Sequence, residues 1–387
     1  MLKLNGIYAC NHPRMRRMNE VGMLRLLRVR GPMSRCELAK ALDLDTKTLT
    51  NVSRDLLKRG FVESVGIRSA VRGRPNELLK ICGTRLQAVG LHVEEHQLTG
   101  ALISLDGQII QRRRVALSLR DSSSRLVAKV KGIIRALVRS ARVPVLGTGL
   151  TFPGILDYSS RTIVACAHLP QWKGVHLDDL GAAPLSAMSY TGAKALAEHW
   201  YGAARNTDDF LLVDAGEGIG CALVNGGRID TRRRYIGGEL GHTVLNPKGD
   251  LCGCGRRGCL ETVASLSAIL KRSGVAPAVS GAGSSLLALQ RRLSSGDRAA
   301  VRAVKDAGRA LGLALANQVN VLSPSRIVMT GETFELSGEF MAAIQVALAA
   351  FVLPAYYKHL KVMQSQLGRD ASLLGAAVLI LQATFDA

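Results

Sequence analysis

The stretch Gly238-Glu-Leu-Gly-His242, followed by Cys252-Gly-Cys254-Gly-Arg-Arg-Gly-Cys259-Leu-Glu261, is the most specific chemical signal in this chain of 387 residues. It holds one imidazole and three thiols, the ligand number and type of a closed tetrahedral zinc site. The predicted metal ligands are His242, Cys252, Cys254 and Cys259. Four protein ligands leave no open position, so the sequence predicts a structural Zn2+ that fixes the loop carrying Glu239 and Glu261. The alternative is three free or redox-active thiols.

Charge and cysteine usage limit the class of protein. The chain carries 51 Lys and Arg against 30 Asp and Glu, a formal net charge of +21. This excess favours a polyanionic partner, with nucleic acid ahead of a membrane surface; a host that uses Arg generally is the alternative. We find no secretory signal pattern and no uncharged apolar run of the ~18 residues that a membrane span needs. The other cysteines are scattered, so we expect a protein of the reducing cytoplasm.

The first 82 residues predict a winged helix-turn-helix. Residues 1–18 contain Arg14, Arg16 and Arg17 and are expected to form a flexible basic arm. Within the DNA-binding domain, residues 19–82, apolar spacing predicts helices over 19–30, 35–42 and 46–59. Ser34 and Glu37 are in capping-box register at the start of the second helix. Strands over 61–65 and 78–81 then form a hairpin around the loop 66–77.

The charge and geometry of this module favour double-stranded DNA as its partner. Residues 1–82 contain 17 Lys and Arg against 7 Asp and Glu. The third helix is the predicted recognition helix, and its outward residues can contact phosphates or base edges: Lys47, Thr48, Thr50, Asn51 and Arg54. At the wing tip, Arg72-Gly73-Arg74 combines little bulk with high charge, as a minor-groove probe requires. The alternative is a winged helix used for protein contacts.

Residues 83–387 predict an α/β body with two similar lobes and a cleft between them. Apolar β-type runs at 86–93, 98–105 and 108–117, with a hairpin turn at Asp106-Gly107, precede a helix over 124–140 and a strand over 143–151. A second set has a helix near 193–201, strands at 210–214 and 220–224 and a turn at Asn225-Gly226. The last third is mostly helical, with a strand at 326–329. Paired β-meanders followed by helices indicate the two lobes.

The metal-ligand block Glu-x-Gly-His…Cys-x-Cys-x4-Cys-Leu-Glu resembles the signature of the ROK family (repressors, open reading frames and sugar kinases). Residues 151–156, which end in Pro-Gly-Ile-Leu, and residues 169–175 are similar to that family's pattern, and the winged helix with Arg-Gly-Arg-Pro resembles its repressor branch. The resemblance covers nearly the whole chain. It implies an actin-like (ribonuclease H-like) two-lobed fold, usually as a homodimer or a dimer of dimers.

The resemblance also implies which residues bind a ligand. In family members that bind sugars, residues at the positions of Glu239, His242 and Glu261 hydrogen-bond sugar hydroxyls. Carboxylates accept from several hydroxyls, and a zinc-bound imidazole can donate through its other nitrogen. The alternative is that Glu239 and Glu261 only brace the zinc loop.

Departures from the family's kinases argue against catalysis. The kinases carry an Asn-Asp-Ala-Asn stretch whose Asp is the catalytic base, but here Tyr190 stands at that position, and a phenol with a pKa near ~10 is a poor base. The first phosphate loop reads His-Val-Glu-Glu-His-Gln over 92–97, without glycine. In the second loop Glu217 replaces a Thr, and Met-Thr-Gly-Glu over 329–332 replaces a Gly-Gly-Gly run. We therefore expect no enzyme activity.

These observations predict a dimeric transcription factor, a repressor of carbohydrate-related genes that reads a pseudo-palindromic operator. A sugar or sugar phosphate in the cleft would change lobe closure and so the spacing of the two winged helices. A protein partner, or no small ligand, is also compatible with the residues. The second hypothesis is a carbohydrate kinase with an accessory DNA-binding module, and the third is a protein–protein scaffold with a vestigial cleft.

Overall fold

The computed structural model describes residues 12–68, 76–166, 169–181, 184–231, 234–276 and 282–386. The chain divides into two compact units, of which the first comprises Met1–Pro153, Ala165–Ala187 and Ala376–Ala387. The second unit comprises Gly154–Val164 and Met188–Gly375. Throughout the described ranges, no helix combines the length and the apolar character needed to cross a bilayer. The domain boundaries 19–82 and 83–387 remain predictions.

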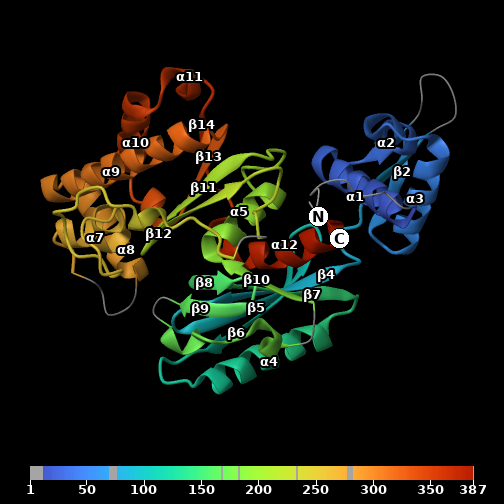
Figure 1. The fold of residues 1–387 in the computed structure, drawn as a ribbon, viewed down its shortest axis with the longest axis horizontal. Helices are drawn as coiled ribbons and strands as arrows, with labels where there is room; N and C mark the ends of the chain where they lie inside the picture. The colour runs from blue at the N-terminus through green and yellow to red at the C-terminus, as the bar shows by residue number, and fades with distance from the viewer. Residues whose placement is uncertain are drawn as a thin grey trace, which may run out of the picture. The chain divides into compact units, whose positions relative to one another are not determined.

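The N-terminal part of the first unit is a winged helix-turn-helix (Figure 1). Its elements are α1 (His12–Arg30), β1 (Met33–Ser34), α2 (Arg35–Leu42), α3 (Thr46–Lys58), β2 (Val62–Arg68) and β3 (Asn76–Ile81), with strand order β1-β3-β2. The predicted capping box is present: Glu37 N donates to Ser34 Oγ at 3.2 Å, and Ser34 N donates to Glu37 Oε2 at 2.8 Å. Fully buried side chains from every helix and from β3 form the core: Met23, Leu38, Leu49, Leu56 and Leu79.

The helix α1 begins earlier than the sequence predicted, so the expectation of a flexible arm is wrong for residues 12–18. Pro13 is tolerated in a first helical turn, where its missing N–H would have no partner. One turn later, Arg16 lies 3.5 Å from Glu20 and 3.4 Å from Asp55 of α3. Arg59 also reaches Glu20, at 2.7 Å. These ion pairs between distant segments hold the start of α1 against α3.

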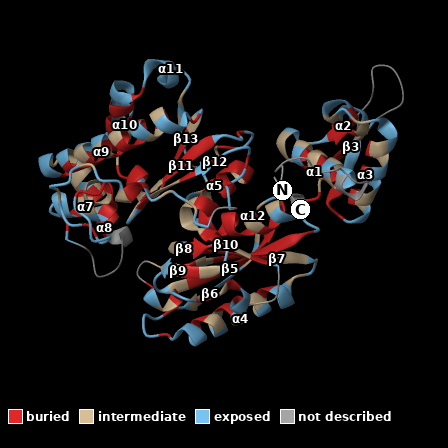
Figure 2. Ribbon diagram, viewed as in Figure 1, coloured by how far each residue is buried: buried red, intermediate tan, exposed pale blue. Residues whose placement is uncertain are grey.

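The rest of the first unit is a five-stranded sheet of order β10-β7-β4-β5-β6. Its strands are β4 (Gln87–Val93), β5 (Gln97–Ser104), β6 (Ile109–Ala116), β7 (Val145–Phe152) and β10 (Leu185–Ser189). The helix α4 (Ser123–Ser140) covers one face with buried Leu126, Val130, Ile133 and Leu137, and its outer side is exposed (Figure 2). The helix α12 (Ala371–Asp386) lies against β7, where a Cβ on Gly149 would fall 1.6 Å from the Ala376 carbonyl oxygen. The predicted turn Asp106-Gly107 joins β5 to β6.

The second unit is built on a four-stranded sheet of order β12-β11-β13-β14. β11 (Phe210–Ala215) pairs antiparallel with β12 (Ile219–Val224) and parallel with β13 (Arg326–Thr330), which pairs parallel with β14 (Lys361–Gln364). A separate ribbon consists of β8 (Gly154–Asp157) and β9 (Thr162–Cys166). The Asn225-Gly226 turn is closed by a bridge between Asn225 and Arg228, and no return strand follows it within the described residues.

Helices supply most of the second unit's core. They are α5 (Tyr190–Tyr201), α6 (Glu261–Ala264), α7 (Leu266–Arg272), α8 (Ala282–Ser294), α9 (Arg298–Leu322), α10 (Gly338–Phe351) and α11 (Pro354–Tyr357). The long helices α9 and α10 lie side by side (Figure 1). Gly308 and Gly312 let them approach, because a Cβ at either position would fall under 3 Å from α10 atoms. The fully buried Leu311, Leu315 and Ile344 fill this contact.

Candidate metal centre and nucleic-acid interface

The predicted metal ligands lie on a tightly folded loop of the second unit. His242 ends a single 3-10 turn, η3 (Leu240–His242), and Cys259 lies two residues before α6. Between them, isolated antiparallel bridges join Val244 to Cys259 and Leu251 to Arg257. Gly258 has a φ of +70°, and a Cβ there would lie 1.5 Å from the Asn246 carbonyl oxygen. Only glycine permits this close approach, so the glycines of the motif shape the loop.

The four ligand atoms of His242, Cys252, Cys254 and Cys259 all lie within 4.8 Å of one another. Cys252 Sγ is 3.6 Å from His242 Nδ1, and Cys254 Sγ is 3.7 Å from Cys259 Sγ. A tetrahedral zinc with Zn–S near 2.3 Å and Zn–N near 2.0 Å separates neighbouring ligands by about 3.5–3.8 Å. A disulfide would need about 2.05 Å between the two sulfurs. The cluster therefore has the dimensions of a tetrahedral metal site and can hold an ion.

The thiols differ in how readily they lose a proton. Burial, with a smaller contribution from the neighbouring thiols of Cys252 and Cys254, raises the pKa of Cys259 to about 12. Cys254 is exposed, and a hydrogen bond from the backbone N–H of Arg256 lowers the pKa of its thiol. Three crowded thiolates repel one another unless a cation neutralises them. The donor set thus fits a divalent ion that binds thiolates.

Glu261 connects the metal loop to the glycine-rich loop between β11 and β12. Its Oε2 accepts from the backbone N–H of Ile219 at 3.2 Å, and its Oε1 lies 4.0 Å from Cys252 Sγ. Glu239, by contrast, is exposed, and its carboxylate lies near the thiol of Cys221. The structure therefore gives Glu261 a bracing role, while sugar contact by Glu239, His242 and Glu261 remains a prediction.

The glycine-rich loop, residues 214–220, has carboxylates beside it. A Cβ on Gly216 would lie 3.2 Å from Glu332 Oε2, so the Glu332 carboxylate lies against the loop. Asp214 Oδ2 accepts from Lys194 Nζ at 2.7 Å, so the positive charge of Lys194 is already paired with a carboxylate. A phosphate brought to the loop would be repelled by Glu332. Lys194 was not singled out from the sequence, because its partner is twenty residues away and no motif links the two.

The residue at the kinase base position is a tyrosine in a confined setting. Tyr190 is the first residue of α5, and its hydroxyl oxygen is buried. In the other unit, at the end of β4, His92 Nδ1 lies 3.0 Å from Thr151 Oγ1. The segment that follows, with Glu94 and Glu95, presents carboxylates where the family's kinases have glycines. A tyrosine thus begins α5, and the 92–97 segment contains two glutamates and no glycine.

The predicted recognition helix is α3, and the structure separates its polar residues into two kinds. Lys47, Asn51 and Arg54 are exposed, and Arg54 Nη1 lies 3.4 Å from Asn51 Oδ1. Thr48 and Thr50 instead donate their hydroxyl hydrogens to the N-cap residue and to the first turn of α3. Thr48 Oγ1 donates to Asp45 Oδ2 at 2.6 Å, and Thr50 Oγ1 donates to Thr46 O at 2.7 Å. Phosphate oxygens are acceptors. In this conformation, of the five predicted residues, only Lys47, Asn51 and Arg54 have side chains that can donate to them.

The position of α3 depends on an arginine that the sequence did not identify. Arg35, the first residue of α2, donates through Nε to Ser53 Oγ at 2.9 Å and pairs with Glu77 of β3. It thereby connects two helices and the wing strand that returns from the tip. The wing-tip residues Arg72, Gly73 and Arg74 lie outside the described residues, so the prediction for them is untested.

Comparison with known proteins agrees with both parts of the chain. Residues 88–383 match the ROK family, and residues 17–65 match the MarR family. The N-acetylglucosamine repressor of Shigella flexneri is 27% identical over 384 residues, which cover 96% of this chain and 94% of that protein. The glucokinase of Thermotoga maritima is 29% identical over 312 residues, which cover 76% of this chain and 98% of that protein.

The structural comparison extends over the full length. A crystal structure of a ROK family transcriptional regulator, described as a homolog of the Escherichia coli MLC protein, matches with a TM-score of 0.79 and 26% identity. The match covers 96% of this chain and 97% of that one. The family match spans well over half of the residues, and the solved structure includes the winged helix. The chain therefore belongs to the ROK family and carries a MarR-type winged helix at its N-terminus.

Proposed function

We propose that this protein is a DNA-binding transcriptional regulator that represses carbohydrate-related genes. The observation that carries the proposal is the joining of a basic winged helix to a ROK body in one chain. The relative named as a repressor matches across both parts, whereas the glucokinase leaves about a quarter of the chain unmatched. We therefore infer a function that requires both the winged helix and the ROK body.

The DNA contact is assigned to α3 and the wing. Lys47, Asn51 and Arg54 enter the major groove, and Arg72-Gly73-Arg74 probes the minor groove. Thr48 and Thr50 contribute only as acceptors, since their hydrogens are already donated at the start of α3. Two copies of the chain present two such helices to a pseudo-palindromic operator.

A homodimer is supported by an exposed apolar surface in the second unit. Val321 is 79% exposed, and Phe351 and Leu353 are 55% and 54% exposed. They are neighbours, because Asn320 donates to the Phe351 carbonyl at 2.9 Å and accepts from Leu353 N at 3.0 Å. Exposed apolar patches of this kind mark association surfaces in soluble proteins. The second copy of the chain is the partner we assign to it.

The body is proposed to bind a structural Zn2+ and a sugar or sugar phosphate. The ion would be held by His242 Nδ1 and the thiolates of Cys252, Cys254 and Cys259, and it would supply positive charge that fixes the loop. His242 Nε2 and the exposed carboxylate of Glu239 are then free to hydrogen-bond sugar hydroxyls. Differential binding of the sugar to two states of the body would alter operator affinity.

Kinase activity is proposed to be lost. Tyr190 replaces the base, and Glu332 places negative charge against the loop that would cradle phosphate. The second candidate, a carbohydrate kinase with an accessory DNA-binding module, is favoured by the likeness of the body to a glucokinase and to a solved ROK hexokinase, both of which leave the winged helix unmatched. A coupled ATPase assay over a sugar panel separates the two, and turnover with any sugar would support the kinase.

The decisive experiment is selection from randomised duplex DNA with the full-length protein, with and without the sugar panel. We expect an enriched pseudo-palindrome whose half-sites lie about one helical turn, or a multiple of it, apart. The matched control is Asn51→Ala, which should abolish or alter the enriched sequence without changing the fold. Absence of any enriched sequence would refute the proposal. A sugar that shifts binding identifies the ligand class, whereas DNA binding that no sugar changes would confine the proposal to a ligand-independent repressor.

A further inference from the structure

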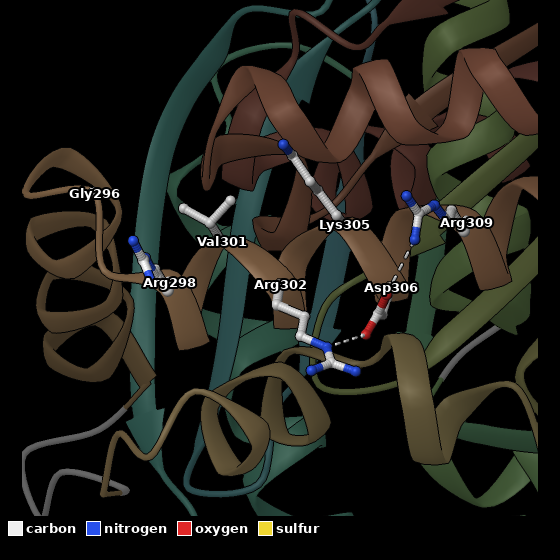
Figure 3. A pocket seen from close by; sticks show the side chains of 7 residues that line it. All are labelled: Gly296, Arg298, Val301, Arg302, Lys305, Asp306 and Arg309. Carbon is white, nitrogen blue, oxygen red and sulfur yellow. Dashed lines mark hydrogen bonds and ion pairs between the residues drawn. The ribbon is translucent and has the colours of Figure 1, made fainter.

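A hollow of about 390 Å³ lies over the first half of α9 in the second unit. It is lined by Gly296, Arg298, Val301, Arg302, Lys305, Asp306 and Arg309 (Figure 3). The spacing of these side chains places them on one face of the helix. Four of them are cations and one is an acid. The hollow shares no residue with the metal loop or with the winged helix, and no part of the proposed function uses it.

The charges in the hollow are only partly balanced. Asp306 lies between Arg302 and Arg309 (Figure 3): Arg309 Nη1 donates to Oδ1 at 3.4 Å, and Arg302 Nε is 3.8 Å from Oδ2. The one carboxylate thus orients two guanidinium groups and neutralises one of them. Among the residues that the structure describes, Arg298 and Lys305 have no carboxylate within 4 Å, and the acid that interacts with Lys305 from farther away is Glu339 of α10. The side chains that line the hollow therefore carry a surplus of three positive charges.

This arrangement is unfavourable for an isolated helix. Arg298 begins α9, where the positive end of the helix dipole repels a cation. The pairs Arg298–Arg302 and Lys305–Arg309 are like charges at i,i+4, each of which destabilises a helix. An anion placed over this face would relieve all of these repulsions together.

We propose that the hollow on α9 binds a small ligand with two or more adjacent phosphate groups. The four cations span about 16 Å along the helix, more than a single phosphate can contact. Guanidinium groups bind phosphate oxygens through paired N–H donors, and Arg302 and Arg309 keep most of theirs after contacting Asp306. The volume lies in the range of small-molecule sites, and Val301 supplies one apolar wall. The inference goes beyond the proposed function, because the ligand differs from the sugar assigned to the metal loop.

The site is placed where it can influence that loop. The opposite face of α9 packs against α6, whose first residue is Glu261. The buried Ala300, Ala303 and Val304 of α9 belong to the same core as Leu260 and Ala264. A ligand bound in the hollow would therefore contact α9, and α9 packs directly against α6, the helix that follows the metal loop.

The test is calorimetric titration of the full-length protein with tripolyphosphate, a nucleoside triphosphate, a sugar bisphosphate and inorganic phosphate. We expect one site per chain and at least about tenfold tighter binding of the multiply phosphorylated probes than of inorganic phosphate. Which of the three probes binds best identifies the source of the phosphates. Failure of all of them to bind would overturn the proposal.

Two double variants locate the site. Arg298→Ala with Lys305→Ala removes two exposed cations and should weaken tripolyphosphate binding at least about tenfold. The matched control, Lys131→Ala with Arg135→Ala, removes two exposed cations at i,i+4 on α4 and should leave the affinity unchanged. Equal losses in both variants would show nonspecific attraction and overturn the proposal. So would an α9 variant that keeps tripolyphosphate binding but loses affinity for non-operator duplex DNA, because the surface would then be a DNA contact. Circular dichroism of both variants verifies that they are folded.

Discussion

The metal loop and the glycine-rich loop lie next to each other and are joined by Glu261, yet they differ in whether their side chains suit the group that such a loop could bind. The metal loop keeps all four of its ligand atoms within 4.8 Å. The glycine-rich loop has the Glu332 carboxylate against Gly216. The difference supports the proposal that this body keeps a metal-binding loop and does not transfer phosphate. A sensor needs such a loop and does not need phosphate transfer.

The largest expected effect comes from Cys254→Ser. Cys254 is exposed, so without a bound metal the change should cost less than about 0.5 kcal/mol. With zinc bound it should release the ion and destabilise the second unit by more than about 3 kcal/mol. Metal analysis and denaturant unfolding measure both effects. The control is Cys36→Ser, an equally exposed thiol on α2, and a Cys254 variant that retains stoichiometric metal would refute the ligand set.

The same comparison predicts a pH dependence of metal binding. The pKa of Cys259, raised to about 12, lies above neutral pH, so metal binding must displace its proton. Affinity therefore rises with pH, and lowering the pH from about 7 to 6 should weaken it at least about tenfold for this thiol alone. Competition with a chelator of known proton affinity measures the change. A pH-independent affinity would mean that Cys259 does not bind the ion as a thiolate.

The winged helix should show a clear contrast between its exposed and its internally bonded side chains. Arg54→Ala should weaken operator binding by about 1–3 kcal/mol and relax specificity at the base it contacts. Thr50→Val should change it by less than about 0.5 kcal/mol, since the Thr50 hydroxyl already donates to Thr46 O. Gel-shift titrations at several salt concentrations compare the two. A larger effect of Thr50→Val would show that its hydroxyl rotates to contact the DNA.

A smaller effect is expected where the glycine-rich loop meets Glu332. Glu332→Gln removes the negative charge and should raise the affinity for a fluorescent ATP analogue by about tenfold. The measurement uses the Arg298→Ala, Lys305→Ala background, so that the hollow on α9 does not contribute. If the protein with Glu332 binds the analogue as tightly as the Glu332→Gln variant does, the charge of Glu332 is not the reason that the loop fails to hold phosphate.

The smallest effect tests Glu261 as the link between the two loops. Glu261→Gln keeps an oxygen that can accept from Ile219 N, whereas Glu261→Ala removes it and should cost about 1 kcal/mol of stability. If Glu261 only braces the loops, Gln should preserve both stability and the response to sugar. A loss of the sugar response in the Gln variant, with stability intact, would instead assign the carboxylate to the ligand.

Local chemistry explains which parts of the structure could be predicted. The capping box of Ser34 and Glu37, the turn at Asp106-Gly107 and the metal-ligand set all depend on residues close together in the chain. In each case a short spacing fixes the geometry. The start of α1 was misplaced because Arg16 is held by Asp55, a residue of another helix.

The amino-acid sequence alone determined the winged helix, the α/β body and the four residues that the structure brings together as a candidate metal site, because each is encoded in short-range patterns of apolar, capping and ligand residues. Only the tertiary structure decided that Glu261 faces Ile219, that Glu332 lies against Gly216 and that four cations on α9 line one hollow. These arrangements join segments far apart in the chain or depend on what neighbouring elements cover. Spacing in the sequence carries no information about such contacts, since packing of the sheet and helices creates them.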